Sequence, residues 1–128
     1  MTKLFSIGAL VSCILVSACG EPSVQDTVFQ NGKPIPISFT LLPTAGTIGK
    51  SGPISNAYRP QILFAALRDG ISCELQLPAG VEQVDPGASS DANIICEKDV
   101  LISQKNLAFV ALEGGRKIGE GRIEMKSR

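Results

Sequence analysis

The amino-acid sequence predicts an all-β domain, either a barrel or a sandwich. Apolar and polar residues alternate over short segments such as "IPISFTLL" at 35–42 and "ISCELQL" at 71–77. Turns rich in proline and glycine, such as "LPAG" and "VDPGASSD", separate these segments, and no stretch has apolar residues at helical spacing. This combination is typical of small antiparallel β structures.

The N-terminus, "MTKLFSIGALVSCILVSACGEPS", has the features of a secretory signal. Lys3 precedes an apolar run that is too short to span a bilayer, and small residues follow the run. The stretch "VSAC" at 16–19 resembles the lipobox of bacterial lipoproteins. We therefore predict a lipoprotein signal peptide over 1–18 and a lipidated Cys19. Cleavage before Cys19 and release as a soluble protein is the alternative.

Acyl chains on Cys19 would anchor the protein to a membrane, which is its predicted partner, since each buried CH₂ contributes about 0.8 kcal/mol. Gly20 stands where an aspartate would indicate retention at the inner membrane. We therefore expect an outer-membrane anchor and a protein that faces the periplasm. Residues 20–34 are polar without a clear period, so we predict a flexible tether over 19–34 and a folded domain over 35–128.

The charge balance excludes a strongly basic or acidic protein. The chain has 12 basic and 12 acidic residues, and loss of Lys3 with the signal leaves 11 against 12, a net charge of −1. Such a balance disfavours nucleic acid as a partner. The 110 residues that remain after removal of 1–18 are enough for one small domain.

The strands can be followed along the chain. In the first, the apolar face consists of Ile35, Ile37, Phe39 and Leu41, and in the second it consists of Ile71, Cys73, Leu75 and Leu77. The later apolar segments are "NIICEKDVLIS", "LAFVAL" and "KIGEGRIEM". In the last of these, acidic and basic residues alternate, which is typical of a solvated strand face.

Two cysteines of the mature chain are predicted to form a disulfide. Cys13 leaves with the signal and Cys19 would carry lipid, so Cys73 and Cys96 remain as a pair in an oxidising compartment. They fall on successive strands that flank "PAGVEQVDPGASSDA" and can face each other across a hairpin. The spacing is not that of a redox Cys-x-x-Cys motif. Without histidine in the sequence, we expect no metal site, no cofactor and no catalytic residues.

The segment "TLLPTAGTIGKSGPI" at 40–54 contains the Gly-Lys-Ser of a phosphate-binding loop. In a true loop of this kind a glycine would stand at Thr44, and the nearest glycine is Gly46. Pro53 opposes the helix that must follow such a loop. We therefore predict a turn that does not bind a nucleotide.

Three segments resemble the C-terminal domain of elongation factor Tu. They are "AYRPQILF" (57–64), "LPAGVEQVDPG" (77–87) and "LAFVALEGGRKIGEGRI" (107–123), and they occur in the family order at nearly the family spacing. This resemblance, over residues 36–126, implies a six-stranded antiparallel Greek-key barrel of the translation-factor type. The GTPase domain and the second barrel of that family have no counterpart in this chain.

The resemblance also implies a binding surface. In the family, this domain contacts the T-stem of aminoacyl-tRNA, the GTPase domain and the nucleotide-exchange factor. The matching positions here are Lys50, Arg59, Gln61, Glu113, Gly114 and Gly115. Competing interpretations are that Arg59 pairs with an acid such as Glu113, and that the glycines serve turns or close backbone packing.

These features predict a non-enzymatic, membrane-anchored lipoprotein whose barrel binds a protein or another envelope component. Retained RNA or tRNA binding through Lys50, Arg59 and Gln61 is the main alternative, although the compartment and the charge both oppose it. An enzyme is the least favoured option, because the carboxylates are scattered over turns and outer faces.

Overall fold

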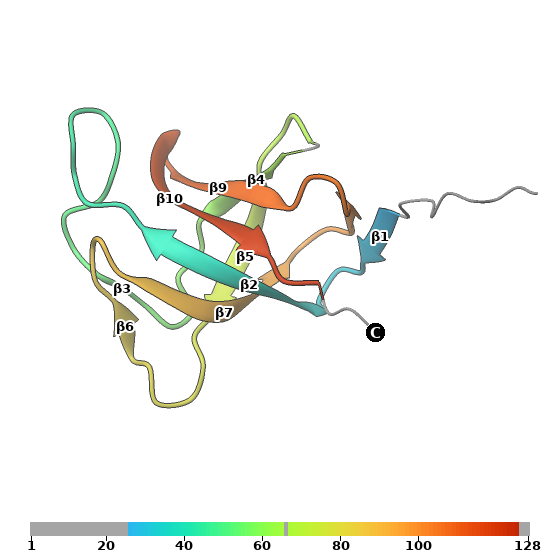
Figure 1. Cartoon of the computed structure of the whole chain (residues 1–128), viewed down its shortest axis with the longest axis horizontal. Coiled ribbons are helices and arrows are strands. Elements are labelled where there is room, and N and C mark those ends of the chain that lie inside the picture. Colours follow the sequence, from blue (N-terminus) through green and yellow to red (C-terminus); the bar gives the residue numbers. More distant parts are fainter. Residues whose placement is uncertain (1–25, 66, 126–128) are drawn as a thin grey trace, which may run out of the picture.

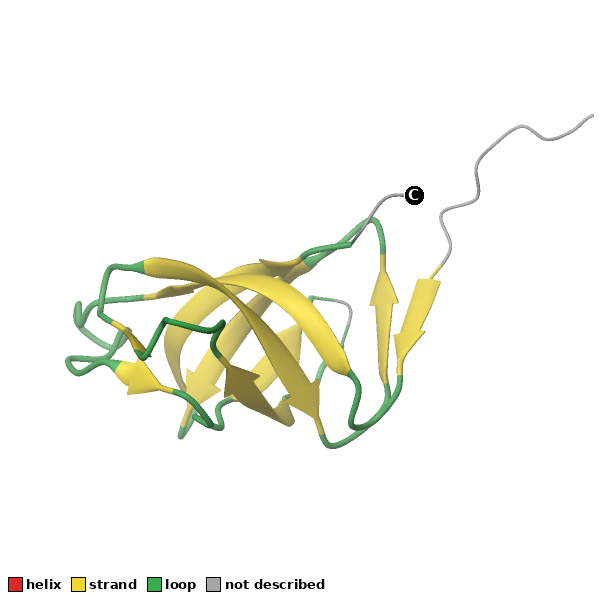
Figure 2. Cartoon of the chain, turned by 90° about the horizontal axis from the view of Figure 1, so that it is seen from below, coloured by secondary structure: helices red, strands yellow, loops and turns green. Residues whose placement is uncertain are grey.

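The computed structural model describes residues 26–65 and 67–125, and these form only strands, turns and loops (Figures 1 and 2). In these two ranges no helix is long and apolar enough to cross a membrane. The predicted signal peptide and Cys19 lie outside the described residues. The strands are β1 (Asp26–Phe29), β2 (Pro34–Leu41), β3 (Ile54–Ser55), β4 (Gln61–Phe64), β5 (Ile71–Gln76), β6 (Gln83–Val84), β7 (Ser89–Cys96), β8 (Val100–Ser103), β9 (Ala108–Glu113) and β10 (Arg116–Ile123).

Six strands close into a barrel in the order β10-β2-β7-β5-β4-β9. Every neighbouring pair in the barrel is antiparallel. Strands β4, β5 and β7 lie side by side in chain order, and β9 returns to lie beside β4, which makes a Greek key. The predicted all-β, six-stranded antiparallel Greek-key barrel is therefore confirmed.

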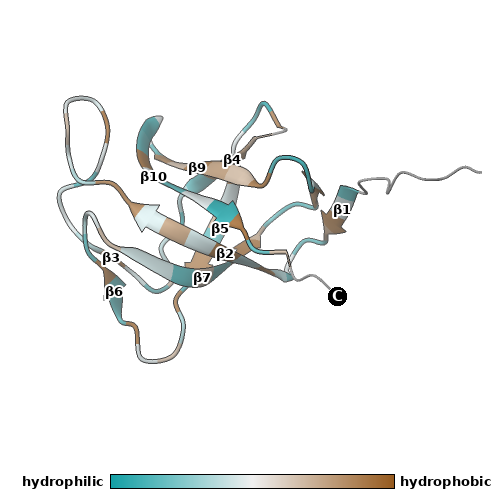
Figure 3. Cartoon of the chain, viewed as in Figure 1, coloured by the Kyte–Doolittle hydropathy of each residue, from teal (hydrophilic) through white to brown (hydrophobic). Residues whose placement is uncertain are grey.

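The interior of the barrel is built from the alternating residues that the sequence indicated. On β2 the residues Ile35, Ile37, Phe39 and Leu41 are all buried, and the bands of hydropathy along this strand are visible in Figure 3. The predicted apolar face of the second strand, from Ile71 to Leu77, is buried as well. No polar or charged side chain is buried within the described part of the chain. Burial of each large apolar side chain contributes about 1.5–3 kcal/mol.

A disulfide joins β5 to β7. Cys73 and Cys96 are direct partners in the antiparallel register, with their Cα atoms 3.9 Å apart, and both are buried. The predicted bridge is therefore confirmed. It links residues 23 positions apart, and loop closure of this size stabilises a fold by about 3 kcal/mol through its effect on the unfolded chain.

The folded domain begins earlier than the sequence suggested, so the prediction of a flexible tether is wrong for residues 26–34. Strand β1 pairs with β8 in a two-stranded ribbon, and Phe29 packs against the core. The turn after β1 is held by the Asn31 amide, which donates to Asp99 Oδ1 at 2.7 Å, and by the Gly32 amide, which donates to the Cys96 carbonyl at 3.2 Å. This polar segment is ordered because it pairs with β8 and Asp99, and the sequence pattern does not reveal these partners because they lie far along the chain.

The barrel has two different ends (Figure 1). The end where the described chain begins carries the β1–β8 ribbon and the turns at 97–99 and 104–107. We call it the entry end. The opposite end carries the loop 42–53, the small β3–β6 ribbon and the turn between β9 and β10. We call it the far end.

Two glycines let β10 close the barrel against both of its neighbours. Gly121 lies opposite Phe39 on β2 and Phe109 on β9. A Cβ atom on Gly121 would lie 2.1 Å from the Ser38 carbonyl oxygen and 2.6 Å from the Phe109 ring. A Cβ atom on Gly119 would lie 2.5 Å from the Phe39 ring. Gly119 and Gly121 therefore serve the close packing of β10 against its neighbours.

We predict that Gly121→Ala lowers the free energy of unfolding by about 3 kcal/mol or more, because the added methyl group meets backbone and a packed ring. Chemical denaturation of the purified protein measures the change. Gly52→Ala is the control, because a Cβ atom there meets no atom within 4 Å, and its effect should stay within about 0.5 kcal/mol. Equal stability of the two variants would contradict the packing role of Gly121.

Candidate binding surface at the far end of the barrel

The Gly-Lys-Ser segment lies in the loop at the far end, and its backbone faces the wrong way for a phosphate. Arg116 donates to three carbonyl oxygens of this loop, to Gly46 at 3.2 Å, to Ile48 at 2.8 Å and to Gly49 at 2.7 Å. A phosphate-binding loop instead turns a run of N–H groups toward its ligand. The carbonyl oxygens of this loop converge on a cation of the protein itself.

Several amide groups of the loop are also occupied. The amides of Ala45 and Ile48 each donate to the other residue's carbonyl oxygen. The Gly49 amide donates to the Lys117 carbonyl at 2.8 Å, and the Lys50 amide donates to the Leu42 carbonyl at 2.9 Å. Gly49 has a φ of +89°, and a Cβ atom there would lie 1.9 Å from the Pro43 carbonyl oxygen. The segment is a tightly braced turn, which matches the interpretation of the sequence as a turn.

Three polar side chains meet beside this loop, and we call them the Glu113 cluster: Lys50, Tyr58 and Glu113. Lys50 Nζ donates to both carboxylate oxygens of Glu113, at 3.1 and 3.3 Å. The Tyr58 hydroxyl donates to Glu113 Oε1, and Lys50 Nζ lies 5.8 Å from the centre of the Tyr58 ring. The carboxylate therefore has two donors, and the cation also has an aromatic neighbour.

The Glu113 cluster changes the acidity of two of its members. The hydrogen bond from Tyr58 is the largest cause of the lowered pKa of Glu113; burial opposes it, and the hydrogen bond and charge of Lys50 add to the lowering. Partial burial raises the pKa of Tyr58, and the hydrogen bond to the Glu113 carboxylate adds to this shift. Both shifts favour the ionised carboxylate and the neutral phenol that the hydrogen bond requires.

The turn that follows Glu113 explains two of the predicted site residues. Gly114 and Gly115 connect β9 to β10 with φ values of +58° and +84°. Two consecutive residues of positive φ are the requirement of a type I′ hairpin turn, which suits the twist of the strands. Gly114 and Gly115 thus fix the direction of β10 and place Glu113 at the rim of the barrel, in agreement with the turn interpretation.

Arg59 is paired, but its partner is not Glu113. Its guanidinium lies 3.3 Å from Glu74 and 4.0 Å from Glu97. The suggestion of an Arg59–Glu113 pair is therefore wrong, because Lys50 and Tyr58 occupy Glu113. Arg59 has a side chain that is 57% exposed, so each of its ion pairs contributes no more than about 1 kcal/mol.

The six predicted surface residues therefore divide into two groups. Lys50, Glu113, Gly114 and Gly115 lie together at the far end. Arg59 and Gln61 lie on the adjoining outer face, where Gln61 is paired in register with Ser72 on β5 and Leu112 on β9.

Sequence reasoning did not assign Tyr58 or Arg116 to this surface. Both stand next to predicted positions, in "AYRPQ" and "LEGGR", and that adjacency was the available signal. A shallow depression of about 250 Å³ lies beside the cluster and is lined by Thr44, Gly49, Lys50, Ser51, Glu113, Arg116 and Ile118.

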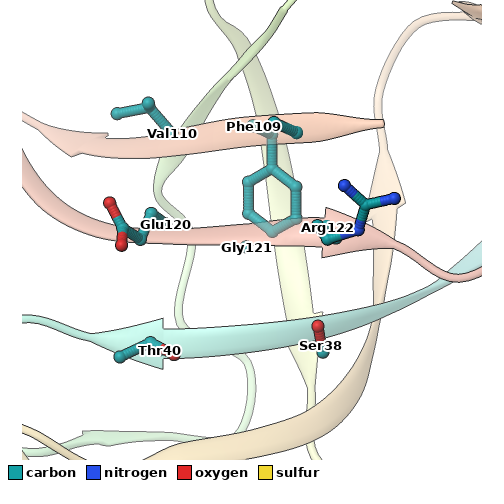
Figure 4. Close-up of a pocket in the computed structure, with 8 residues that line it drawn as sticks. Ser38, Thr40, Phe109, Val110, Glu120, Gly121 and Arg122 are labelled. Atoms are coloured by element: carbon teal, nitrogen blue, oxygen red, sulfur yellow. The ribbon is translucent and has the colours of Figure 1, made fainter. Parts of the chain in front are cut away.

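A larger depression of about 530 Å³ lies on the outer face of β10 (Figure 4). Glu120 and Arg122 flank Gly121, with Ser38 and Thr40 on the neighbouring β2. The side chains of Glu120 and Arg122 diverge from each other in Figure 4. Glu120 forms an ion pair with Lys117, with 3.0 Å between Nζ and Oε1. The charged ends of Glu120 and Arg122 therefore do not point toward a common centre, in contrast to the side chains of the Glu113 cluster.

The described residues contain no group of three or more His, Cys, Asp or Glu side chains that could hold a metal ion. No known family model matches the chain. The resemblance to the C-terminal domain of elongation factor Tu therefore stays a prediction from sequence. The surface itself offers a fixed carboxylate, a cation and a phenol, which suit recognition of polar groups by hydrogen bonding.

We predict that the Glu113 cluster makes stability fall at acidic pH. The pKa of Glu113 is lower in the folded protein than in the unfolded chain, so its contribution is present above the unfolded value of about 4.3 and is lost as the pH falls through the folded pKa. In Glu113→Gln, the unfolding free energy should therefore decrease less steeply than in the native protein as the pH is lowered below about 5. The effect should be below about 1 kcal/mol, because the side chain is 48% exposed.

Denaturant titrations at a series of pH values measure this difference. Glu82→Gln is the matched control, since Glu82 is an exposed residue of the loop between β5 and β6. The assignment fails if both variants change the pH profile equally.

Proposed function

We propose that this protein is a non-enzymatic lipoprotein, anchored by lipid to the bacterial outer membrane and facing the periplasm, whose barrel binds a protein or another envelope component. The signal-like N-terminus and the lipobox-like "VSAC" support the anchor. The binding role is supported by one observation above all, the placement of the Glu113 cluster at the end of the barrel opposite to the chain entry.

That placement separates anchoring from recognition. The described chain begins with Asp26 at the entry end, so an anchor at Cys19 would hold the protein by that end. The far end, with Lys50, Tyr58 and Glu113, would then point away from the membrane. A partner that carries its own donors and acceptors could approach it without obstruction by the bilayer.

The far end is also rigid enough to recognise a partner at low cost. Arg116 fixes the loop at three carbonyl oxygens, and Lys50 in turn is fixed to Glu113. A surface that is ordered before binding loses less conformational freedom when the partner arrives. This preorganisation supports a binding module and does not require any chemistry from the barrel.

RNA binding receives less support from the same contacts. Lys50 faces the Glu113 carboxylate, and Arg59 faces Glu74 and Glu97. Affinity for a phosphate backbone comes from several cations that can replace counterions. Here the two predicted RNA-facing cations already have carboxylate partners, so the translation-factor resemblance is better understood as ancestry than as activity. RNA binding by the purified protein at low salt would favour this alternative.

We predict that Cys19 carries lipid in the mature protein. Cells grown with an alkyne-bearing fatty acid should label the native protein, and mass spectrometry should find Cys19 at the mature N-terminus with an added acyl mass. Cys19→Ser should remove the label, while Cys13→Ser, within the predicted signal, should leave it unchanged. A mature N-terminus at an unmodified Cys19 would contradict the anchor.

We also predict that the partner contacts the far end. A photoreactive amino acid at Ser51, an exposed residue beside Lys50, should crosslink the partner in intact cells. The same probe at Asp91, an exposed residue on β7, is the matched control and should give little product. Lys50→Glu should abolish the Ser51 product, because it places two carboxylates together at the cluster, and Cys19→Ala should reduce it by mislocalising the protein.

Unfolding midpoints of the variants verify that each is folded. Crosslinking that is equal at Ser51 and Asp91, or absent at Ser51 in correctly lipidated protein, would contradict the proposed recognition surface.

A further inference from the structure

The two-stranded β1–β8 ribbon carries apolar residues on both of its faces. The inner face carries Phe29, Val100 and Ile102, which belong to the core or pack against it. The outer face carries Val28 and Leu101, which are direct partners in the register and are 56% and 47% exposed, and also the polar pair Asp26 and Ser103 two residues along each strand. A ribbon with one solvated face normally alternates between apolar and polar residues. At Val28 and Leu101 the outer face of this ribbon is therefore apolar where a solvated face would be polar.

These two residues stand out in the described part of the chain. Among its large hydrophobic side chains, three are exposed, and they are Val28, Leu101 and Ile48. Val28 and Leu101 lie next to each other at the entry end, whereas Ile48 is alone in the loop at the far end. An adjacent pair of exposed apolar residues indicates a contact surface more strongly than a single one does.

Three lysines lie in the turns at the ends of this ribbon. Lys33 lies in the turn after β1, Lys98 in the turn before β8, and Lys105 in the turn after β8. All three are exposed, and none forms one of the ion pairs found among residues 26–65 and 67–125. Three acids lie nearby: Asp26 is exposed on the outer face itself, Asp99 accepts the Asn31 amide, and Glu97 contacts Arg59. An apolar pair with lysines in the flanking turns suits the interface of a membrane with anionic headgroups.

The chain length places this ribbon next to the proposed anchor. Six residues, 20–25, separate Cys19 from the start of β1. Even a fully extended chain spans no more than about 25 Å from Cys19 to Asp26. Figure 2 shows the ribbon standing apart from the barrel, with the described chain beginning in it. A short connection of this kind keeps the ribbon at a high effective concentration near the bilayer.

We propose that the outer face of the β1–β8 ribbon rests on the phospholipid bilayer that holds the acyl chains of Cys19. Val28 and Leu101 enter the interface, and Lys33, Lys98 and Lys105 lie at the headgroups. The inference rests on the proposed lipid anchor and adds an orientation to it. It fixes the barrel with the entry end on the membrane and the Glu113 cluster away from it.

The ribbon is suited to assist an anchor and not to replace one. Two apolar side chains and a few lysines give weak, reversible attraction to a surface, with about a fivefold gain for each lysine near anionic lipid. The lipid supplies permanence, and the ribbon supplies a preferred orientation. A second copy of this chain or another protein could also cover Val28 and Leu101, and the experiment separates these occupants.

The test places a photoreactive residue on the full chain in intact cells. Leu101→p-benzoylphenylalanine probes the ribbon, and Ile48→p-benzoylphenylalanine is the matched control, because Ile48 is similarly exposed at 38% but lies at the far end. Mass spectrometry of the crosslinked peptides identifies the adduct, and the N-terminal peptide of the same sample reports the lipid on Cys19.

We expect phospholipid adducts at position 101 and severalfold fewer at position 48. Replacement of Lys33, Lys98 and Lys105 by glutamate should lower the yield at position 101 while leaving the lipid on Cys19 unchanged. Equal lipid adducts at both positions would overturn the inference, since the anchor alone would then bring both close to lipid. Adducts with a second copy or with another protein at position 101 would overturn it as well.

The N-terminal peptide separates this inference from the proposed function. If Cys19 carries lipid and position 101 captures none, the orientation is wrong and the anchor stands. If Cys19 carries no lipid and position 101 still captures phospholipid, the anchor is wrong and the ribbon contact stands. If both are negative, both proposals fail.

Discussion

Closure of the barrel depends on the absence of side chains at Gly119 and Gly121 on β10. This strand pairs with β2 on one side and β9 on the other, and the rings of Phe39 and Phe109 fill the volume that side chains on Gly119 and Gly121 would need. With side chains at these two positions, β10 could not lie this close to both neighbours and the sheet could not close. It would then expose two strand edges and the aliphatic core that now lies inside. The positions of all the surface residues, including Glu113 at the end of β9, follow from this closure.

The far end depends in turn on Arg116, at the start of the same strand. Because the guanidinium takes the carbonyl oxygens of the loop, the loop is held in one conformation and Lys50 is directed toward Glu113. A charge on the closing strand thus orders a segment about seventy residues earlier in the chain. Core packing and surface geometry are therefore linked through one short stretch, from Glu113 to Gly121.

The barrel itself was predictable because its information is local. A period of two in β2 and β5 identifies the inward residues, and a pair of cysteines on successive strands identifies the bridge. The β1 strand was missed because four residues are too few to show a period, and its partner β8 lies more than seventy residues away. The partners of Arg59 depend on the register of β5 with β7, which local pattern does not reveal. The direction of the loop carbonyls could not be predicted either. Every residue has a backbone carbonyl, so the sequence does not show which of them face Arg116.

If the protein is exported as proposed, the bridge between Cys73 and Cys96 also ties its lifetime to its location. A chain that remained in a reducing cytosol would keep two buried thiols and would lack about 3 kcal/mol of stability. Its unfolded fraction would be more than a hundredfold larger, which is the species that cellular proteases degrade. Export and oxidation would then act together as a checkpoint, and a copy that failed to leave the cytosol would be selectively removed.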